Sequence, residues 1–332
     1  MIETVPVIDL TPFLEGSNVG KQRVAAEVAT ACESLGFLTI VGHGVPRELT
    51  DMTYDVTREF FDLPLEERMA VIQPAVDIFR GYHPIASLAL SYSLDQKTPP
   101  DLKEGFVVGP IVTPDEEYFR RPEAVNFFYP NLWPKRPEGF RDTWTDYYQE
   151  MEALAATLMR IFAVALGLCE DYFDDKINKH ISYLMASNYP KQPEDPLPGQ
   201  LRAGAHTDYG SLTILYRDQA PGGLQILNQH NEWVDVKHVP ESFVINIGDL
   251  MARWTNDRWV STMHRVVNPP RNVALKSRRQ SLVFFHQPNY DASINCLESC
   301  CDADNPPRYA PATTAEHLMM KALKMFDVDA EL

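Results

Sequence analysis

"AGAHTDYGSLTILY", residues 203–216, combines a polar pair with a predicted strand. His206 and Asp208 stand two residues apart, and an apolar run rich in β-branched residues follows them. Side chains of an extended segment repeat every two residues, so His206 and Asp208 point to the same side and can bind one metal ion together. The alternative is a polar turn before a buried strand, with a structural or surface histidine. The spacing alone does not decide between the two.

The chain around this stretch alternates between short strands and turns. From residue 181 onward, β-branched and aromatic runs such as "ISYLMASNY", "SFVINIG" and "QSLVFFHQ" are separated by Pro, Gly and Asn. This rhythm predicts a mainly β fold with a double-stranded β-helix, or jelly-roll, core and flanking helices. Apolar periodicity predicts helices over 21–36, 47–62, 138–167 and 313–326, and strands at 5–10 and 37–42. Residues 70–125 show no clear periodicity and are expected to be irregular.

Size and composition exclude several classes of protein. With 332 residues, 45% of them hydrophobic and 23% charged, the chain can bury a large core. A net charge of −16 opposes binding to nucleic acid or to anionic lipid. No segment approaches the length of a membrane-spanning helix. Five dispersed cysteines suit a reducing compartment, which predicts a cytoplasmic protein. The oligomeric state stays open.

A third metal ligand is available in "STMHRVV". His264 stands at the start of a predicted strand there, where a barrel can bring it to the same opening as His206 and Asp208. Two imidazoles and one carboxylate on one face leave coordination positions open, which is the arrangement of non-haem Fe(II) oxygenases. Oxygen and a co-substrate can then bind the same metal.

A second pair with the same spacing follows in "RRQSLVFF". Arg279 and Ser281 share one face of a predicted strand. A guanidinium offers a planar fork to a carboxylate and the hydroxyl adds another donor, so the pair can hold the distal carboxylate of a dicarboxylic acid. Taken alone, the pair is also compatible with an exposed strand.

Together these motifs resemble a known family. "HTD", "NIGD", "HRV" and "RQS" occur in the order and approximate spacing of the isopenicillin N synthase-like, 2-oxoglutarate-dependent Fe(II) dioxygenases. "VPVIDL", "GFLTIVGHGVP" and "REFFDLPLEER" look like the N-terminal region of that family. The resemblance implies one catalytic domain over 1–332, with an N-terminal region over 1–125 and the jelly-roll core over about 180–290.

The resemblance also implies a cofactor set and residue roles. Fe(II) is bound by His206, Asp208 and His264, and 2-oxoglutarate by Arg279 and Ser281 with the hydroxyl of Tyr189. The family couples the decarboxylation of 2-oxoglutarate by O2, which releases succinate and CO2, to oxidation of a C–H bond, and the resemblance implies a small-molecule substrate. Hydroxylation is the default, while desaturation, cyclisation and demethylation are alternatives.

The sequence departs from the family pattern at two places. Ser187 stands where the family has an asparagine, and Asn188 follows one place later, which leaves the asparagine contact open. The gap between His264 and Arg279 is longer than usual, and "NPPRNVALKS" is expected to form an extra turn.

Other functions are weighed against this one. An oxidase like isopenicillin N synthase would use Arg279 and Ser281 for its substrate and would need no 2-oxoglutarate. That enzyme has a glutamine near its C-terminus that reaches the metal, and "KALKMFDVDAEL" has none. A metal-binding barrel without activity is expected to have lost a ligand or the Arg-x-Ser pair, and both are present here.

Substrate contacts are the least determined. "FRGYHP" resembles a segment that approaches the substrate in relatives, so Arg80 and Tyr82 are candidates, with a solvated loop as the alternative. His286 follows the Arg-x-Ser strand and is a third candidate. Its spacing from Ser281 places it on the opposite face unless a bulge intervenes.

Overall fold

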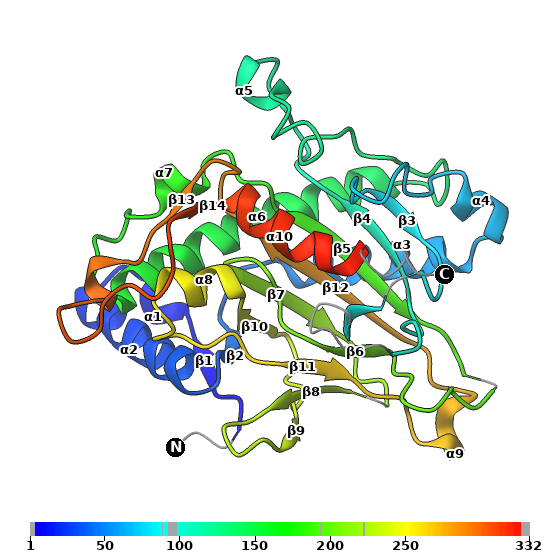
Figure 1. The fold of residues 1–332 in the computed structure, drawn as a ribbon. Helices are drawn as coiled ribbons and strands as arrows, with labels where there is room; N and C mark the ends of the chain where they lie inside the picture. The colour runs from blue at the N-terminus through cyan, green and yellow to red at the C-terminus, as the bar shows by residue number, and fades with distance from the viewer. Residues whose placement is uncertain (1–3, 88, 92–97, 193, 222, 327–332) are drawn as a thin grey trace.

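The fold is built on two sheets that face each other (Figure 1). The computed structural model describes residues 4–87, 89–91, 98–192, 194–221 and 223–326. The large sheet runs in the order β1 (Val7–Asp9), β2 (Phe37–Val41), β10 (Phe243–Ile247), β7 (Leu212–Arg217), β12 (Arg279–His286), β5 (Tyr183–Tyr189), β4 (Glu104–Val108) and β3 (Gly81–His83). The small sheet runs in the order β6 (Ala203–His206), β11 (His264–Val266), β8 (Leu224–Leu227) and β9 (Trp233–Asp235), and β13 (Ser293–Ile294) pairs with β14 (Ala312–Thr313).

Helices flank these sheets. The longer ones are α2 (Asn18–Ser34), α3 (Arg47–Asp62), α6 (Phe140–Ala165) and α10 (Thr314–Phe326). The short ones are α1 (Thr11–Leu14), α4 (Leu65–Met69), α5 (Glu117–Arg120), α7 (Asp174–Ile177), α8 (Asp249–Trp254), α9 (Arg271–Ala274) and the 3-10 turn η2 (Glu298–Cys300). The predicted helices and the β-rich jelly-roll core are therefore confirmed.

Helix α6 forms and packs as its sequence predicts. Its buried side chains recur at helical spacing, as in Trp144, Tyr148, Met151 and Leu158, and produce one apolar face. The ring of Tyr148 meets that of Phe284 on β12 edge-on, with 5.2 Å between the ring centroids. Helices α2 and α3 pack beside α6, so this layer covers one face of the large sheet.

The two faces of the large sheet differ, and β12 shows how. Leu282 and Phe284 join the core formed with the helices, and we call this side the outer face. Arg279 and Ser281 alternate with them and lie on the opposite side, which we call the inner face. On that side, inner-face residues Leu215 and Val244 pack against Leu224 of the small sheet. The inner face is therefore the inside of the barrel.

Residues 70–125 correct the sequence prediction. Their sequence predicts an irregular segment, but they contribute β3 and β4, which extend the large sheet beyond β5. The two runs, GYH and EGFVV, are too short to show periodicity on their own. They become strands because β4 pairs with β5 and β3 with β4, which is a tertiary effect.

Two turns are explained by local chemistry. Gly36 ends α2 with a φ of +61°, and a Cβ at this position would lie 1.9 Å from the carbonyl oxygen of Val260, so only glycine fits. The predicted extra turn after β11 contains the short helix α9. Within the described ranges, no helix is long and apolar enough to cross a membrane.

Candidate active site

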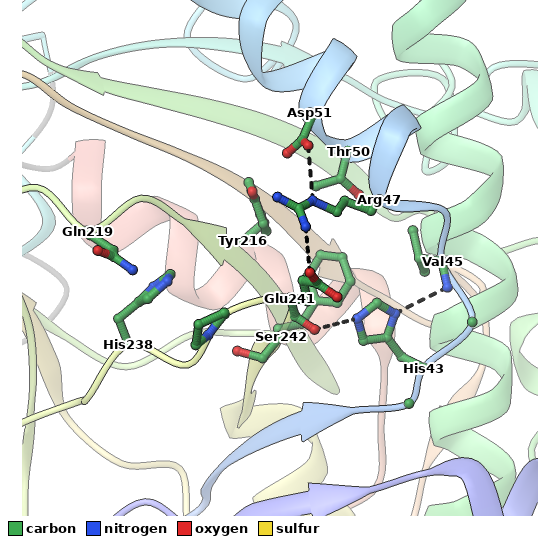
Figure 2. Close-up of a pocket in the computed structure, with 14 residues that line it drawn as sticks. His43, Val45, Arg47, Thr50, Asp51, Tyr216, Gln219, His238, Glu241 and Ser242 are labelled. Carbon is green, nitrogen blue, oxygen red and sulfur yellow. Dashed lines mark hydrogen bonds and ion pairs between the residues drawn. The ribbon is translucent and has the colours of Figure 1, made fainter.

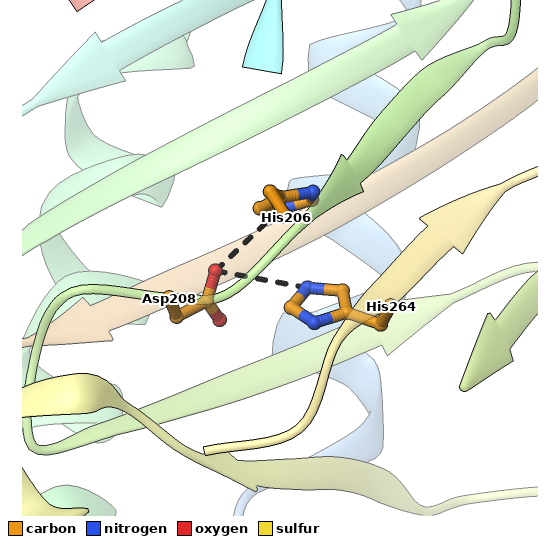
Figure 3. A group of neighbouring side chains, drawn as sticks. All are labelled: His206, Asp208 and His264. Carbon is orange, nitrogen blue, oxygen red and sulfur yellow. Dashed lines mark ion pairs between the residues drawn. The ribbon is translucent and has the colours of Figure 1, made fainter. Parts of the chain in front are cut away.

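Three side chains converge between the sheets (Figure 3). His206 ends β6, Asp208 lies in the turn that follows, and His264 begins β11 as the direct cross-strand partner of His206. Asp208 Oδ1 lies 3.6 Å from His206 Nε2 and 3.7 Å from His264 Nε2. One ligand atom from each residue falls within 4.8 Å of the others, so one metal ion can contact all three. The structure thus brings the predicted triad together.

The backbone orients both imidazoles. His206 Nδ1 donates to the carbonyl of Gly204 at 2.8 Å, and His264 Nδ1 to that of Thr262 at 3.2 Å. This leaves each Nε2 facing Asp208 Oδ1, in the orientation that a shared metal ion requires. Burial, followed by the neighbouring His264, lowers the pKa of His206 well below its usual range, so the ring is neutral at neutral pH.

The carboxylate of Asp208 is held by its second oxygen. Thr213 Oγ1 donates to Oδ2 at 2.5 Å and Asn246 Nδ2 at 2.7 Å, while Oδ1 faces the two imidazoles. Burial raises the pKa of Asp208, but the two histidines and these two hydrogen bonds outweigh it and the pKa is lowered overall. A charged oxygen is therefore aimed at the point where a metal ion would bind. Asn246 belongs to the "NIGD" motif, but its role in holding Asp208 was not predicted.

The turn that carries Asp208 is fixed from outside the barrel. The amide of Asp249 donates to the carbonyl of Asp208 at 2.7 Å, and Thr207 Oγ1 donates to the Asp249 carboxylate at 3.1 Å. Lys321, on α10, pairs with the same carboxylate at 2.6 Å. The C-terminal helix therefore packs on the loop that positions the triad.

A cationic cluster lies further along the inner face. Arg279, at the start of β12, is 2% exposed and is the cross-strand partner of Tyr189. Ser281 follows on the same face, so the structure brings the predicted Arg279, Ser281 and Tyr189 together. Asp218 is the nearby acid, with its Oδ1 4.0 Å from Arg279 Nη1.

Two further arginines join this cluster and were not predicted. Burial, and then the neighbouring Arg279, lowers the pKa of both Arg202 and Arg217 to about 10. Arg202 donates to the carbonyls of Pro221 and Ser277, and Arg217 to that of Val236, so both are held in place by backbone. Arg217 is four residues from Thr213 on β7, so alternation along the strand places both side chains on the same face. This spacing is the signal in the sequence that could have identified Arg217. The three guanidiniums make this end of the barrel attractive to an anion.

Alternation of side chains along β5 explains why Ser187, and not Asn188, lies on the inner face. Ser187 is the cross-strand partner of Ser281 and lies on the inner face. Asn188 points to the outer face, where it donates to the Glu104 carboxylate at 2.7 Å and accepts from Arg278 Nε at 2.8 Å. The asparagine therefore takes no part in the inner-face cluster.

Arg80 and Tyr82 hydrogen-bond to the protein itself, which does not support the predicted substrate contact. The guanidinium of Arg80 donates to the backbone carbonyls of Phe79, Phe127 and Tyr129. The hydroxyl of Tyr82 donates to Glu104 on the outer face at 2.5 Å. Neither polar group is available to a substrate in this arrangement, because each is committed to the fold.

His286 also lies on the outer face, because it is five residues from Ser281 on β12 and side chains at odd spacing lie on opposite faces. Its Nδ1 is 2.7 Å from Ser211 Oγ, and its ring centroid is 6.0 Å from that of His180. The side chain is buried and its position does not support the predicted substrate contact.

A cavity of about 460 Å³ opens at a different place, between the start of α3 and the loop before β10 (Figure 2). Several of its polar groups are paired with one another: Arg47 binds Asp51 and Glu241, and His43 binds the backbone of Val45 and Glu241. None of the triad lines it.

Comparison with known families is consistent with this geometry. Residues 5–136 match the family described as non-haem dioxygenase in morphine synthesis N-terminal. Residues 180–288 match the 2OG-Fe(II) oxygenase superfamily, and this range contains the triad and the predicted anion-binding residues.

Individual relatives match over almost the whole chain. A 2-oxoglutarate-Fe(II) type oxidoreductase of Emericella nidulans is 35% identical over 94% of this chain and 87% of its own. A homoarginine-6-hydroxylase of Oryza sativa subsp. japonica is 31% identical over 98% of both chains. Among solved structures, a full-length Neurospora crassa protein in complex with alpha-KG and thymine superposes with a TM-score of 0.83, at 29% identity over 96% of both chains.

Proposed function

The chain belongs to the 2OG-Fe(II) oxygenase superfamily, and we propose that its two-histidine, one-carboxylate triad binds the catalytic Fe(II). As a member, it is a 2-oxoglutarate- and Fe(II)-dependent dioxygenase that uses O2 and acts on a small molecule. The assignment of its individual residues is our proposal, and the convergence of three ligand atoms within 4.8 Å carries it.

The donor set of the triad fits Fe(II). Two imidazoles and one carboxylate on one side leave open positions for further ligands. Asp208 Oδ1 and both Nε2 atoms point at one another, while each remaining polar atom of the three side chains is used by a neighbour. These neighbours therefore present the ligands in the protonation states that a metal requires.

The cationic cluster fits the distal carboxylate of 2-oxoglutarate. Arg279 is buried on the inner face with Tyr189 beside it and Ser281 two residues along. A buried guanidinium favours a bound anion, and its planar fork fixes the orientation of a carboxylate. Arg202 and Arg217 strengthen the positive potential but are bound to backbone, so we assign them a positioning role.

When bound, Fe(II) and 2-oxoglutarate would allow O2 to oxidise a C–H bond, with release of succinate and CO2. The chain supplies orientation: Arg279 fixes one end of the co-substrate, and Asn246 and Thr213 hold Asp208 so that Oδ1 faces the metal position. Hydroxylation of the substrate is the outcome we propose.

The substrate is proposed to be a free small molecule rather than a nucleic acid. The net charge of −16 disfavours a polyanion. Two solved relatives were crystallised with small molecules. The Neurospora crassa protein was solved with thymine. JOX2 was solved with JA, and it is 28% identical to this chain with a TM-score of 0.77.

Two further assignments are proposals. One catalytic domain over 1–332 is supported by β1 and β2, which pair in the same sheet as β10, and by β4, which pairs with β5. A cytoplasmic location is supported by the free thiols of the chain, such as Cys32 and Cys169.

The test is the stoichiometry of the reaction. Fe(II)-loaded protein is given O2 and 2-oxoglutarate with a panel of small molecules, and succinate and O2 are measured. We expect succinate release that requires both Fe(II) and 2-oxoglutarate. Oxygen consumption with a substrate but without 2-oxoglutarate would instead indicate an oxidase. The second half of the C-terminal stretch that lacks a glutamine, residues 327–332, lies outside the described residues.

A further inference from the structure

The inner face next to the triad carries an aromatic surface. Cross-strand pairs run from Thr213 on β7 to Phe285 on β12 and then to Tyr183 on β5. Thr213 hydrogen-bonds Asp208, so this row begins at the proposed metal ligand. The rings of Tyr183 and Phe285 stack with centroids 4.8 Å apart, and Phe79 meets Tyr183 edge-on at 5.3 Å.

The aromatic side chains of this surface are partly exposed, whereas the other residues of β5 and β12 are buried. Along β12 every residue except Phe285 is buried, and along β5 every residue except Tyr183. Phe79 is also partly exposed. Apolar rings that remain accessible inside a barrel offer a contact surface to a ligand, because burial of their faces is favourable.

His83 adds a polar group at the edge of this surface. It is the cross-strand partner of Gly105, which pairs with Ser187, so its side chain lies on the inner face. Its ring centroid is 4.7 Å from that of Phe79. The side chain is 2% exposed, and within the described part of the chain its Nε2 has no hydrogen-bond partner. A buried polar nitrogen without a partner is costly, so an oxygen atom that reached this nitrogen would be bound favourably.

Lys103 sets the sign of the potential near His83. Burial and then Lys103 lower the pKa of His83 to about 4, so the imidazole is neutral at neutral pH. Lys103 directly precedes Glu104, which lies on the outer face opposite Asn188, so alternation along the strand places Lys103 on the inner side. A positive potential here favours an oxygen acceptor over a second donor.

We propose that the substrate is a flat aromatic or conjugated ring, bound against Phe79, Tyr183 and Phe285, with an edge oxygen that accepts a hydrogen bond from His83. This inference rests on the proposed function, because it places the reacting carbon beside the triad. In this arrangement the segment "FRGYHP" approaches the substrate through Phe79 and His83, which lie on the inner face, and not through Arg80 and Tyr82.

The experiment uses anaerobic protein loaded with Fe(II) and 2-oxoglutarate, titrated by calorimetry with 2-naphthoate. The matched probe is decahydro-2-naphthoate, which has the same carboxylate on a saturated, non-planar skeleton. We expect the aromatic acid to bind and the saturated acid to bind more weakly, because only a planar ring can stack on these side chains. This comparison needs no variant.

Two variants then test the polar contact. His83→Phe keeps a ring and removes the nitrogen, and we expect it to weaken 2-naphthoate binding by about tenfold, the loss of one hydrogen bond. Tyr82→Phe changes the adjacent residue on the outer face and is expected to leave this affinity unchanged.

The visible absorption band of iron-chelated 2-oxoglutarate, followed in the same samples, separates the two levels of the proposal. A normal band with no binding of 2-naphthoate, with equal binding of both acids, or with full affinity in His83→Phe would overturn the substrate assignment alone. Absence of the band with iron bound would contradict the proposed function and this inference with it.

Discussion

The two faces of the large sheet are made by the same strands and serve different purposes. On β12, Leu282 and Phe284 pack against the helical layer, while Arg279 and Ser281, on alternate positions, lie inside the barrel. Alternation along a strand is what separates them. Neighbouring residues on a strand can thus differ completely in role. The face of the sheet on which a residue lies is therefore a better guide to its function than its closeness in sequence to a site residue.

The polar residues of the two faces also differ. On the outer face Glu104 is satisfied by Tyr82, Arg68 and Asn188. On the inner face Asp208 keeps one oxygen turned towards two histidines, and His83 keeps a nitrogen without a partner among the described residues. The bonds to Glu104 help to hold the outer face together, while Asp208 and His83 keep polar atoms that a ligand can complete.

Removing a buried carboxylate from the inner face should have the greatest effect. Asp208→Ala deletes the charged ligand of the triad, so iron binding and turnover should both be lost, as measured by metal content after dialysis and by succinate release. Glu104→Gln changes an equally buried carboxylate on the outer face and should keep its iron. Iron retained by Asp208→Ala would remove this triad from consideration.

Adjacent phenylalanines give the next contrast. Phe284→Ala empties a fully buried site under the helices and should lower the free energy of unfolding by roughly 3 to 5 kcal/mol. Phe285→Ala truncates a partly exposed inner-face ring and should cost clearly less. Urea unfolding of both variants measures the difference, and equal losses would mean that the two faces are not distinct in packing.

The adjacent residues Arg278 and Arg279 test whether only the inner face binds 2-oxoglutarate. Arg279→Ala removes a charge-assisted contact worth roughly 1.5 to 3 kcal/mol, so the KM for 2-oxoglutarate should rise by about 10- to 150-fold. Arg278 binds Asp62 and Asn188 on the outer side, and Arg278→Ala should leave that KM unchanged. Similar KM values in the two variants would place the co-substrate elsewhere.

A smaller effect is expected from the residues that hold Asp208. Asn246→Ala removes the amide that donates to Asp208 Oδ2, while Thr213 still donates to the same oxygen. Iron affinity should fall by roughly 10- to 100-fold without being lost, as measured by competition with a chelator. Wild-type affinity in this variant would show that Thr213 alone orients the carboxylate.

Much of this arrangement could be predicted from the sequence. The period of two places His206 with Asp208 and Arg279 with Ser281 before any strand pairing is known. The position of His264 at the start of a later strand adds a third ligand, and the family resemblance adds Tyr189. The structure brings both groups together, and their roles as ligands stay predictions.

The remainder depends on pairing between distant strands. The family resemblance offers Arg80 and Tyr82 as candidate substrate contacts and does not single out Phe79 or His83, because the face that each residue occupies is set only by the pairing of β3 with β4. The convergence of Arg202 and Arg217 on Arg279 joins residues from separate parts of the chain, which no local pattern can show.

The inner face is proposed to bind 2-oxoglutarate at an iron held by the triad. An anaerobic titration of the Fe(II)-loaded protein with 2-oxoglutarate tests this directly, because a metal-chelated 2-oxo acid has a visible charge-transfer band. We expect a band that saturates in the wild type and in Arg278→Ala, and that needs much more 2-oxoglutarate in Arg279→Ala. Bound iron without any band in the wild type would contradict the proposal.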